Sequence, residues 1–115
     1  MTSKEVESMI HFLYRPEMYI TKAQKTTVVT FMNGADFGKL AEPYWTYLLT
    51  QFLEVDLKIM KPALGWPHQV EVYSKNNQKD WFNGFKEVML QMIEQSDQIP
   101  YTTELKRLKE RYSGN

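Results

Sequence analysis

The sequence predicts a single, mostly α-helical domain, a bundle of five or six helices with little or no β-structure. Apolar residues recur at helical spacing in most segments, Pro and Gly separate those segments, and several of them begin with a helix-capping residue. The chain has 115 residues, of which 43% are hydrophobic. Residues 1–115 can therefore form one domain with one packed core.

The first helix is expected at about Ser3–Tyr14. Thr2 and Glu5 have the spacing of a capping box, in which each side chain accepts a hydrogen bond from a free amide at the helix start. The helix should end at Arg15–Pro16, because the residue before a proline is disfavoured in the α conformation.

The second helix is expected at about Lys22–Asn33. Thr21 and Gln24 repeat the capping-box spacing, and Asn33–Gly34 suits a helix C-terminus because glycine readily adopts the left-handed conformation. The β-branched run within residues 26–31 favours a strand instead. The choice between helix and strand stays open there, with helix preferred.

The third helix is expected at about Glu42–Met60, with Pro43 in its first turn. Its wide apolar face predicts the central helix of the bundle, packed on more than one side. Asp56 falls within that face, so we expect it to pair with a cation such as Arg15, or the helix to bend there. The apolar face comprises Trp45, Leu48, Leu49, Phe52, Val55 and Ile59.

Three further elements follow. A short element begins at Trp66, and residues 68–73 fit either a helix or a strand. Asp80 can cap a strong helix that continues to about Ser96, in which Gly84 permits close packing. A last helix, capped by Thr102 or Thr103, is expected to continue to about Tyr112.

The residues that carry common enzyme chemistry are missing or scattered. There is no cysteine, and His11 and His68 lie far apart in the sequence, so we expect no metal or cofactor. Asp36–Gly38 spells the kinase magnesium motif, but its companion motifs are absent. Nothing brings two of the candidate acid–base carboxylates together, so we expect no catalytic residues and no enzyme. Those carboxylates are Glu42, Glu54, Asp56 and Glu71.

The composition also bears on location and partners. No apolar run is long enough to span a membrane, and the N-terminus lacks a signal-peptide core, so the sequence predicts a cytoplasmic protein. The chain carries 14 basic and 14 acidic residues, which makes nucleic acid an unlikely partner class. The alternative, a small nucleic-acid-associated regulator, would use the basic last helix. Its cations are Lys106, Arg107, Lys109 and Arg111.

The polar side of the third predicted helix is the candidate surface for a protein partner. Tyrosines beside an acid are typical of interfaces, because tyrosine buries a large ring at low entropic cost. The alternative is that these tyrosines only cover a neighbouring helix. The candidate partner-binding residues are Glu42, Tyr44, Tyr47, Gln51, Glu54 and Lys58.

Arg15–Ile20 resembles the R-P-x-M-Y signature of small bacterial immunity proteins encoded beside polymorphic or contact-dependent toxins. The likeness extends over most of the chain, through Phe31–Gly34, Trp66 and Trp81–Phe85. It implies a cytoplasmic, non-enzymatic protein that binds the C-terminal domain of one cognate toxin, with a nuclease as one candidate, and blocks its active site.

The residues of this signature are expected to hold the fold rather than to face the toxin. Pro16 should fix a sharp turn, from which Met18 and Tyr19 return their apolar side chains to the bundle. Arg15 should cap helix carbonyls or pair with an acid such as Asp56.

Overall fold

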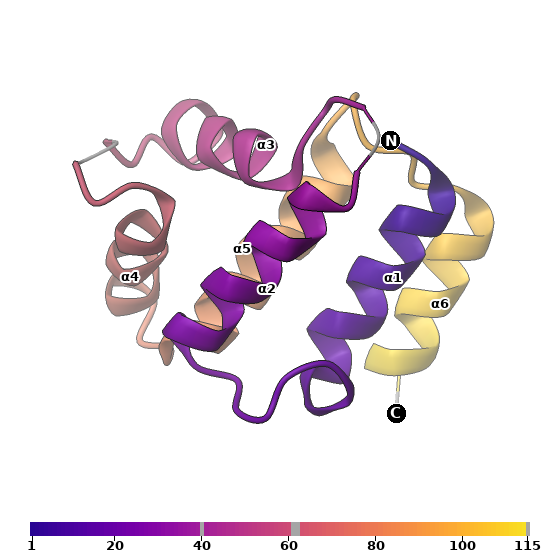
Figure 1. Ribbon diagram of the computed structural model, residues 1–115, viewed down its shortest axis with the longest axis horizontal. Helices are drawn as coiled ribbons and strands as arrows, with labels where there is room; N and C mark the ends of the chain where they lie inside the picture. The colour runs from indigo at the N-terminus through magenta and orange to yellow at the C-terminus, as the bar shows by residue number, and fades with distance from the viewer. Residues whose placement is uncertain (40, 61–62, 115) are drawn as a thin grey trace.

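A computed structural model describes residues 1–39, 41–60 and 63–114 (Figure 1). Within these ranges the chain forms six α-helices and no strand, which confirms the predicted all-α fold. A 3-10 turn, η1, follows α1, and a π-helical turn, η2, directly continues α3. The elements are α1 (Ser3–Tyr14), η1 (Pro16–Met18), α2 (Lys25–Phe37), α3 (Trp45–Gln51), η2 (Phe52–Asp56), α4 (Trp66–Asn76), α5 (Trp81–Gln95) and α6 (Thr103–Ser113).

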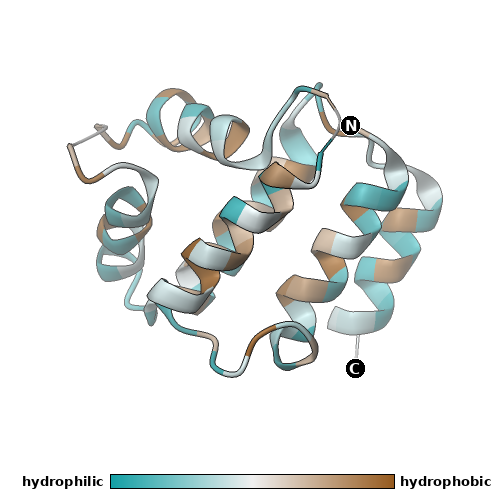
Figure 2. Cartoon of the chain, in the orientation of Figure 1, coloured by the Kyte–Doolittle hydropathy of each residue, from teal (hydrophilic) through white to brown (hydrophobic). Residues whose placement is uncertain are grey.

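The helices pack around one continuous core. In Figure 1, α5 passes behind α2 through the middle of the molecule, α1 and α6 lie on one side, and α3 and α4 lie on the other. Hydrophobic and hydrophilic residues alternate along the helices, as expected where one face of each helix is buried (Figure 2). The core therefore draws on residues from all six helices.

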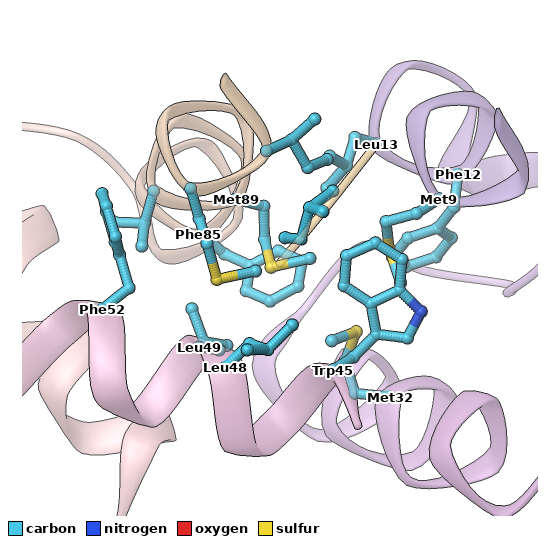
Figure 3. Packing of buried hydrophobic residues seen from close by; sticks show 14 of the residues in the cluster. Met9, Phe12, Leu13, Met32, Trp45, Leu48, Leu49, Phe52, Phe85 and Met89 are labelled. Atoms are coloured by element: carbon cyan, nitrogen blue, oxygen red, sulfur yellow. The ribbon is translucent and has the colours of Figure 1, made fainter. Parts of the chain in front are cut away.

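The centre of the core lies between α3, α5 and α1. Figure 3 shows Trp45, Leu48 and Leu49 of α3 directed toward Phe85 and Met89 of α5. All five are at most 3% exposed. As expected for the third predicted helix, α3 is packed on more than one side, because it also contacts α2 and α4; α5, however, lies in the middle of the bundle.

Three helices begin where their capping residues predict. Thr2 and Glu5 form the capping box of α1, with hydrogen bonds of 3.2 and 2.8 Å to each other's backbone amides. Asp80 accepts from the amide of Asn83 at the start of α5, and Thr102 caps α6 in the same way. These caps are local in sequence, which is why pattern alone placed these starts correctly.

The predicted bounds of the second helix were wrong by about one turn. Residues 26–31 are helical, but α2 begins at Lys25 and continues through Gly34 to Phe37. The amide of Gln24 donates to Thr27 Oγ1 at 3.3 Å, so Gln24 stands at the start of the capping interaction instead of at its end. Gly34 lies inside the helix at an exposed position, where glycine is less favourable than alanine.

The single helix predicted over Glu42–Met60 was also wrong. The α-helix begins only at Trp45, so Pro43 precedes it, and α3 gives way to the π-helical turn after Gln51. The amide of Leu57 then donates to the carbonyl of Phe52, five residues back. This extra residue per turn rotates the following side chains off the buried face, so the predicted apolar arc ends before Val55.

Asp56 therefore does not enter the core. It lies exposed at the end of η2, and no ion pair joins it to Arg15 or to any other residue in the described ranges. The predicted pairing with Arg15 is not seen, and the helix ends at Asp56, where the alternative expected it to bend. Residues 68–73 are helical, within an α4 that is longer than the short element expected.

The Arg15–Tyr19 segment behaves only partly as expected. Arg15 ends α1, and Pro16 begins η1. The ring of Tyr19 packs edge-on against Phe12, with centroids 5.7 Å apart. Met18, however, is 73% exposed and does not return to the bundle. Arg15 is exposed as well, and no ion pair joins it to an acid among the described residues.

Candidate functional site: a groove between α2 and α3

An open groove of about 920 Å³ lies between the end of α2 and the outer face of α3 and η2. Both polar and apolar side chains line it. Its lining residues are Asn33, Asp36, Phe37, Lys39, Tyr44, Thr46, Tyr47, Thr50, Gln51, Glu54 and Val55.

Asp36 joins the two walls of the groove. Its carboxylate accepts hydrogen bonds from the amides of Trp45, at 2.7 Å, and Thr46, at 3.2 Å, and from the Thr46 hydroxyl. These amides are the free donors at the start of α3, so Asp36 caps a helix that begins nine residues later. The orientation of α3 relative to α2 is therefore set by a charged cap, not only by the core.

A second polar contact fixes the end of α2 to α1. Lys39 Nζ lies 2.6 Å from Glu5 Oε2, and the lysine side chain is only 3% exposed. The hydrogen bond from Lys39 lowers the pKa of the Glu5 carboxyl below its usual value, with a further contribution from the amide of Thr2. The ammonium is thus neutralised beneath the surface and adds little positive charge to the groove.

Large apolar side chains along this groove are exposed to solvent. Phe37 is 93% exposed, Val55 67% and Tyr47 57%. Gln51 Nε2 donates to the Tyr47 hydroxyl at 2.9 Å, which holds the tyrosine along the outer face of α3. Exposed apolar side chains that gather in one hollow are typical of an interaction surface.

The π-helical turn is responsible for part of this exposure. Phe52 and Leu53 of η2 are buried, whereas Glu54 and Val55 point outward and line the groove. In a continuous α-helix, Val55 would follow Trp45, Leu48 and Phe52 on the buried face. Such π-helical insertions occur frequently at functional sites, where they redirect side chains at a local cost in regularity.

The structure brings together four of the six candidate partner-binding residues. Tyr44, Tyr47, Gln51 and Glu54 line the groove. Glu42 lies in an adjoining hollow of about 450 Å³, which it shares with Pro43, Tyr44, Tyr47 and Gln98. Lys58 lies beyond η2, outside the groove, with a backbone φ of 57°.

Sequence reasoning missed the α2 wall of the groove. Asp36 belongs to a tripeptide whose companion kinase motifs are absent, and its cap on α3 links residues that no local pattern connects. Phe37 lies beyond the predicted helix end at Asn33, so its position opposite the buried Val28 and Met32 of α2 became clear only in the structure. An apolar residue on the solvent side of a helix is a usable signal of a binding surface.

Several ionisable groups outside the groove form structural contacts. On α6, Lys109 pairs with Glu94 of α5, and the Lys106 ammonium lies 5.7 Å from the ring centroid of Tyr101. Arg107 and Arg111 share a hollow with two acids, Glu7 and Glu104, and with His11. This mixture of signs on α6 does not favour the nucleic-acid alternative.

The histidines and carboxylates do not assemble into a metal site in the described part of the chain. His11 Nδ1 is hydrogen-bonded to the Tyr112 hydroxyl, and His68 faces Glu71 at 3.4 Å. No group of three or more His, Asp or Glu residues in the described ranges is placed to hold a metal ion.

Comparisons of the chain with protein-family models, with curated proteins and with solved structures found no match. None of the helices formed by the described residues has the length and apolar character needed to cross a membrane.

Proposed function

We propose that the chain is an immunity protein, which binds the C-terminal domain of one cognate bacterial toxin and blocks its active site. The observation that supports binding is the groove between α2 and α3, where Phe37, Tyr47 and Val55 are held out in solvent. The toxin as the class of partner comes from the resemblance of Arg15–Ile20 to the R-P-x-M-Y signature. The two parts of the proposal therefore rest on different residues.

The groove has the composition of a protein-binding surface. A standard interface takes about 800 Å² from each partner, which is a small share of the 7055 Å² surface of this molecule. Three aromatic rings and a valine lie at the groove, and polar side chains such as Asn33 and Gln51 surround them. Aromatic anchors within a polar rim provide most of the binding energy in characterised interfaces.

Contacts between residues distant in sequence hold the walls of the groove. Asp36 fixes α3 to α2, and the part-buried Lys39–Glu5 pair fixes the end of α2 to α1. A preformed surface binds with less loss of conformational entropy than a mobile one. Tight binding to a single partner, which an immunity protein needs, is consistent with this arrangement.

The proposal is tested by co-expression with the toxin domain encoded by the neighbouring gene. The wild-type chain should restore growth to cells that express the domain, and the purified domain should lose its activity at a one-to-one ratio. Phe37→Ser should abolish protection, because the ring is 93% exposed and its loss leaves the fold intact.

Met18→Ser is the matched control. Met18 is also a large exposed apolar residue, 73% exposed, but it lies on η1, away from the groove. This variant should protect as well as the wild type. Growth arrest that the wild-type chain does not relieve would overturn the toxin assignment, and equal loss in both variants would overturn the groove as the binding surface.

A further inference from the structure

We infer that the partner surface that occupies the groove is basic and carries an apolar side chain at its centre. The inference rests on the proposed function in that it concerns the same groove. It adds the chemistry of the partner, which follows from the distribution of charge around the exposed apolar residues.

The sequence concentrates acids on this side of the molecule. The chain as a whole is neutral, with 14 residues of each sign. Residues 36–56, which end α2 and form α3 and η2, contain four acids and a single cation. The acids are Asp36, Glu42, Glu54 and Asp56, and the cation is Lys39.

The structure removes that cation from the surface. Lys39 is 3% exposed and is neutralised by Glu5, which comes from another helix. Asp36 directs its carboxylate to the amides of α3, where its charge is partly offset. The exposed acids at the groove are therefore Glu54, in its lining, and Glu42, in the adjoining hollow, and Asp56 follows Glu54 at the end of η2.

These three acids have no ion-pair partner among the described residues. Some exposed acids on other faces are paired. Glu87 lies 2.9 Å from Lys79, and Glu94 pairs with Lys109. The nearest cations in sequence are Lys39, which Glu5 neutralises, and Lys58, which lies outside the lining of the groove, as Asp56 does. The negative potential at the groove is thus not compensated by its own neighbours.

The apolar and acidic side chains of the groove together determine the chemistry of the partner surface that can bind there. Burying Phe37 and Val55 requires an apolar contact, which brings the partner close to Glu54 on the same turn. An acidic protein, a nucleic acid or an anionic membrane would be repelled at that distance. A protein surface with lysine or arginine around an apolar side chain satisfies both requirements.

The first test uses peptides and needs no knowledge of the natural partner. A short helical peptide of leucine and lysine is titrated into the labelled chain, and amide NMR shifts are followed. We expect shifts at Phe37, Tyr47 and Val55, and none with a matched peptide in which glutamate replaces lysine. Equal shifts with both peptides, or shifts centred on another face, would overturn the inference.

The second test reverses the charges. The triple variant Glu42→Lys, Glu54→Lys, Asp56→Lys should weaken binding of the lysine peptide about tenfold and reduce its dependence on salt. A control triple reverses exposed acids outside the groove and changes net charge equally. It should bind as the wild type does. The control positions are Glu17, Glu104 and Glu110.

The outcomes separate this inference from the proposed function. Equal loss of peptide binding in both triple variants would show that only net charge matters, and the inference would fail. Protection against the toxin that the groove triple leaves intact would also contradict it, while the immunity function would stand. If the basic peptide binds specifically at the groove but the chain does not protect against the toxin, the inference stands and the toxin assignment fails.

Discussion

Gly84 lies where α5 packs tightly against Ser74 of α4, and it allows a sharp test of the packing. A Cβ at this position would lie 1.8 Å from Ser74 Oγ, 2.8 Å from Ser74 Cβ and 3.2 Å from Ser74 Cα. Rotating the serine hydroxyl would relieve only the first contact, because the other two involve the Cβ and the backbone. Gly84→Ala must therefore push the two helices apart by roughly half an ångström within a close-packed core.

The expected cost is the balance of two opposing terms. Alanine is favoured over glycine inside a helix by about 1 kcal/mol, whereas overpacking in a core costs about 1–3 kcal/mol. Because the clash reaches the Ser74 backbone, we expect the overpacking term to win, with a net loss of about 1–2 kcal/mol. That loss would lower Tm by about 5–10 °C. Urea and thermal unfolding followed by far-UV circular dichroism measure both quantities.

Gly34 provides the matched control. It also lies inside a helix, but a Cβ there would meet nothing within 4 Å. Gly34→Ala should stabilise the chain by about 0.5–1 kcal/mol, because only the helix-propensity term remains. Two variants with the same chemical change should thus shift stability in opposite directions. A Gly84→Ala protein as stable as Gly34→Ala would refute the close packing of α4 on α5.

Three further changes test the polar contacts. Asp36→Ala should lower the free energy of unfolding, measured by urea titration, by about 1–2 kcal/mol, because the start of α3 loses its cap. An unchanged free energy of unfolding would mean that the core alone holds α3. Glu87 has its pKa lowered by the hydrogen bond from Tyr73 and by Lys79. Its contribution to stability is therefore present above the ordinary carboxyl pKa of 4.5 and is lost as the pH falls below that value. In a plot of the urea unfolding midpoint against pH, Glu87→Gln should therefore reduce the decrease at acidic pH. Tyr112→Phe removes the hydrogen bond to His11 and should cost about 0.5–1.5 kcal/mol by the same assay; no loss would mean that ring packing alone joins α6 to α1.

The parts of the fold that were predicted correctly are those that local chemistry determines. The box of Thr2 and Glu5 and the caps Asp80 and Thr102 each act within three residues, so the starts of α1, α5 and α6 could be located from the sequence. At α2 the local signal was ambiguous, because Gln24 fits both the end of one capping box and the start of another.

The parts that were missed depend on contacts distant in sequence or on irregular geometry. The periodic apolar pattern continues beyond Phe52, but the backbone changes to a π-helical turn there, and no residue type signals that change. Asp36 caps α3 from another helix, which cannot be read from spacing. The α3 side of the groove was therefore predictable from its tyrosines and polar residues, and the α2 side required the structure.

Site-specific cross-linking in living cells tests the central claim most directly. A photoreactive phenylalanine analogue is placed at position 37 in the groove, and at position 18 on η1 as the control; both side chains are exposed. We expect one discrete adduct from position 37, which mass spectrometry identifies as a toxin C-terminal domain, and none from position 18. Absence of an adduct at position 37, or the same adducts from both positions, would contradict the groove as the binding surface.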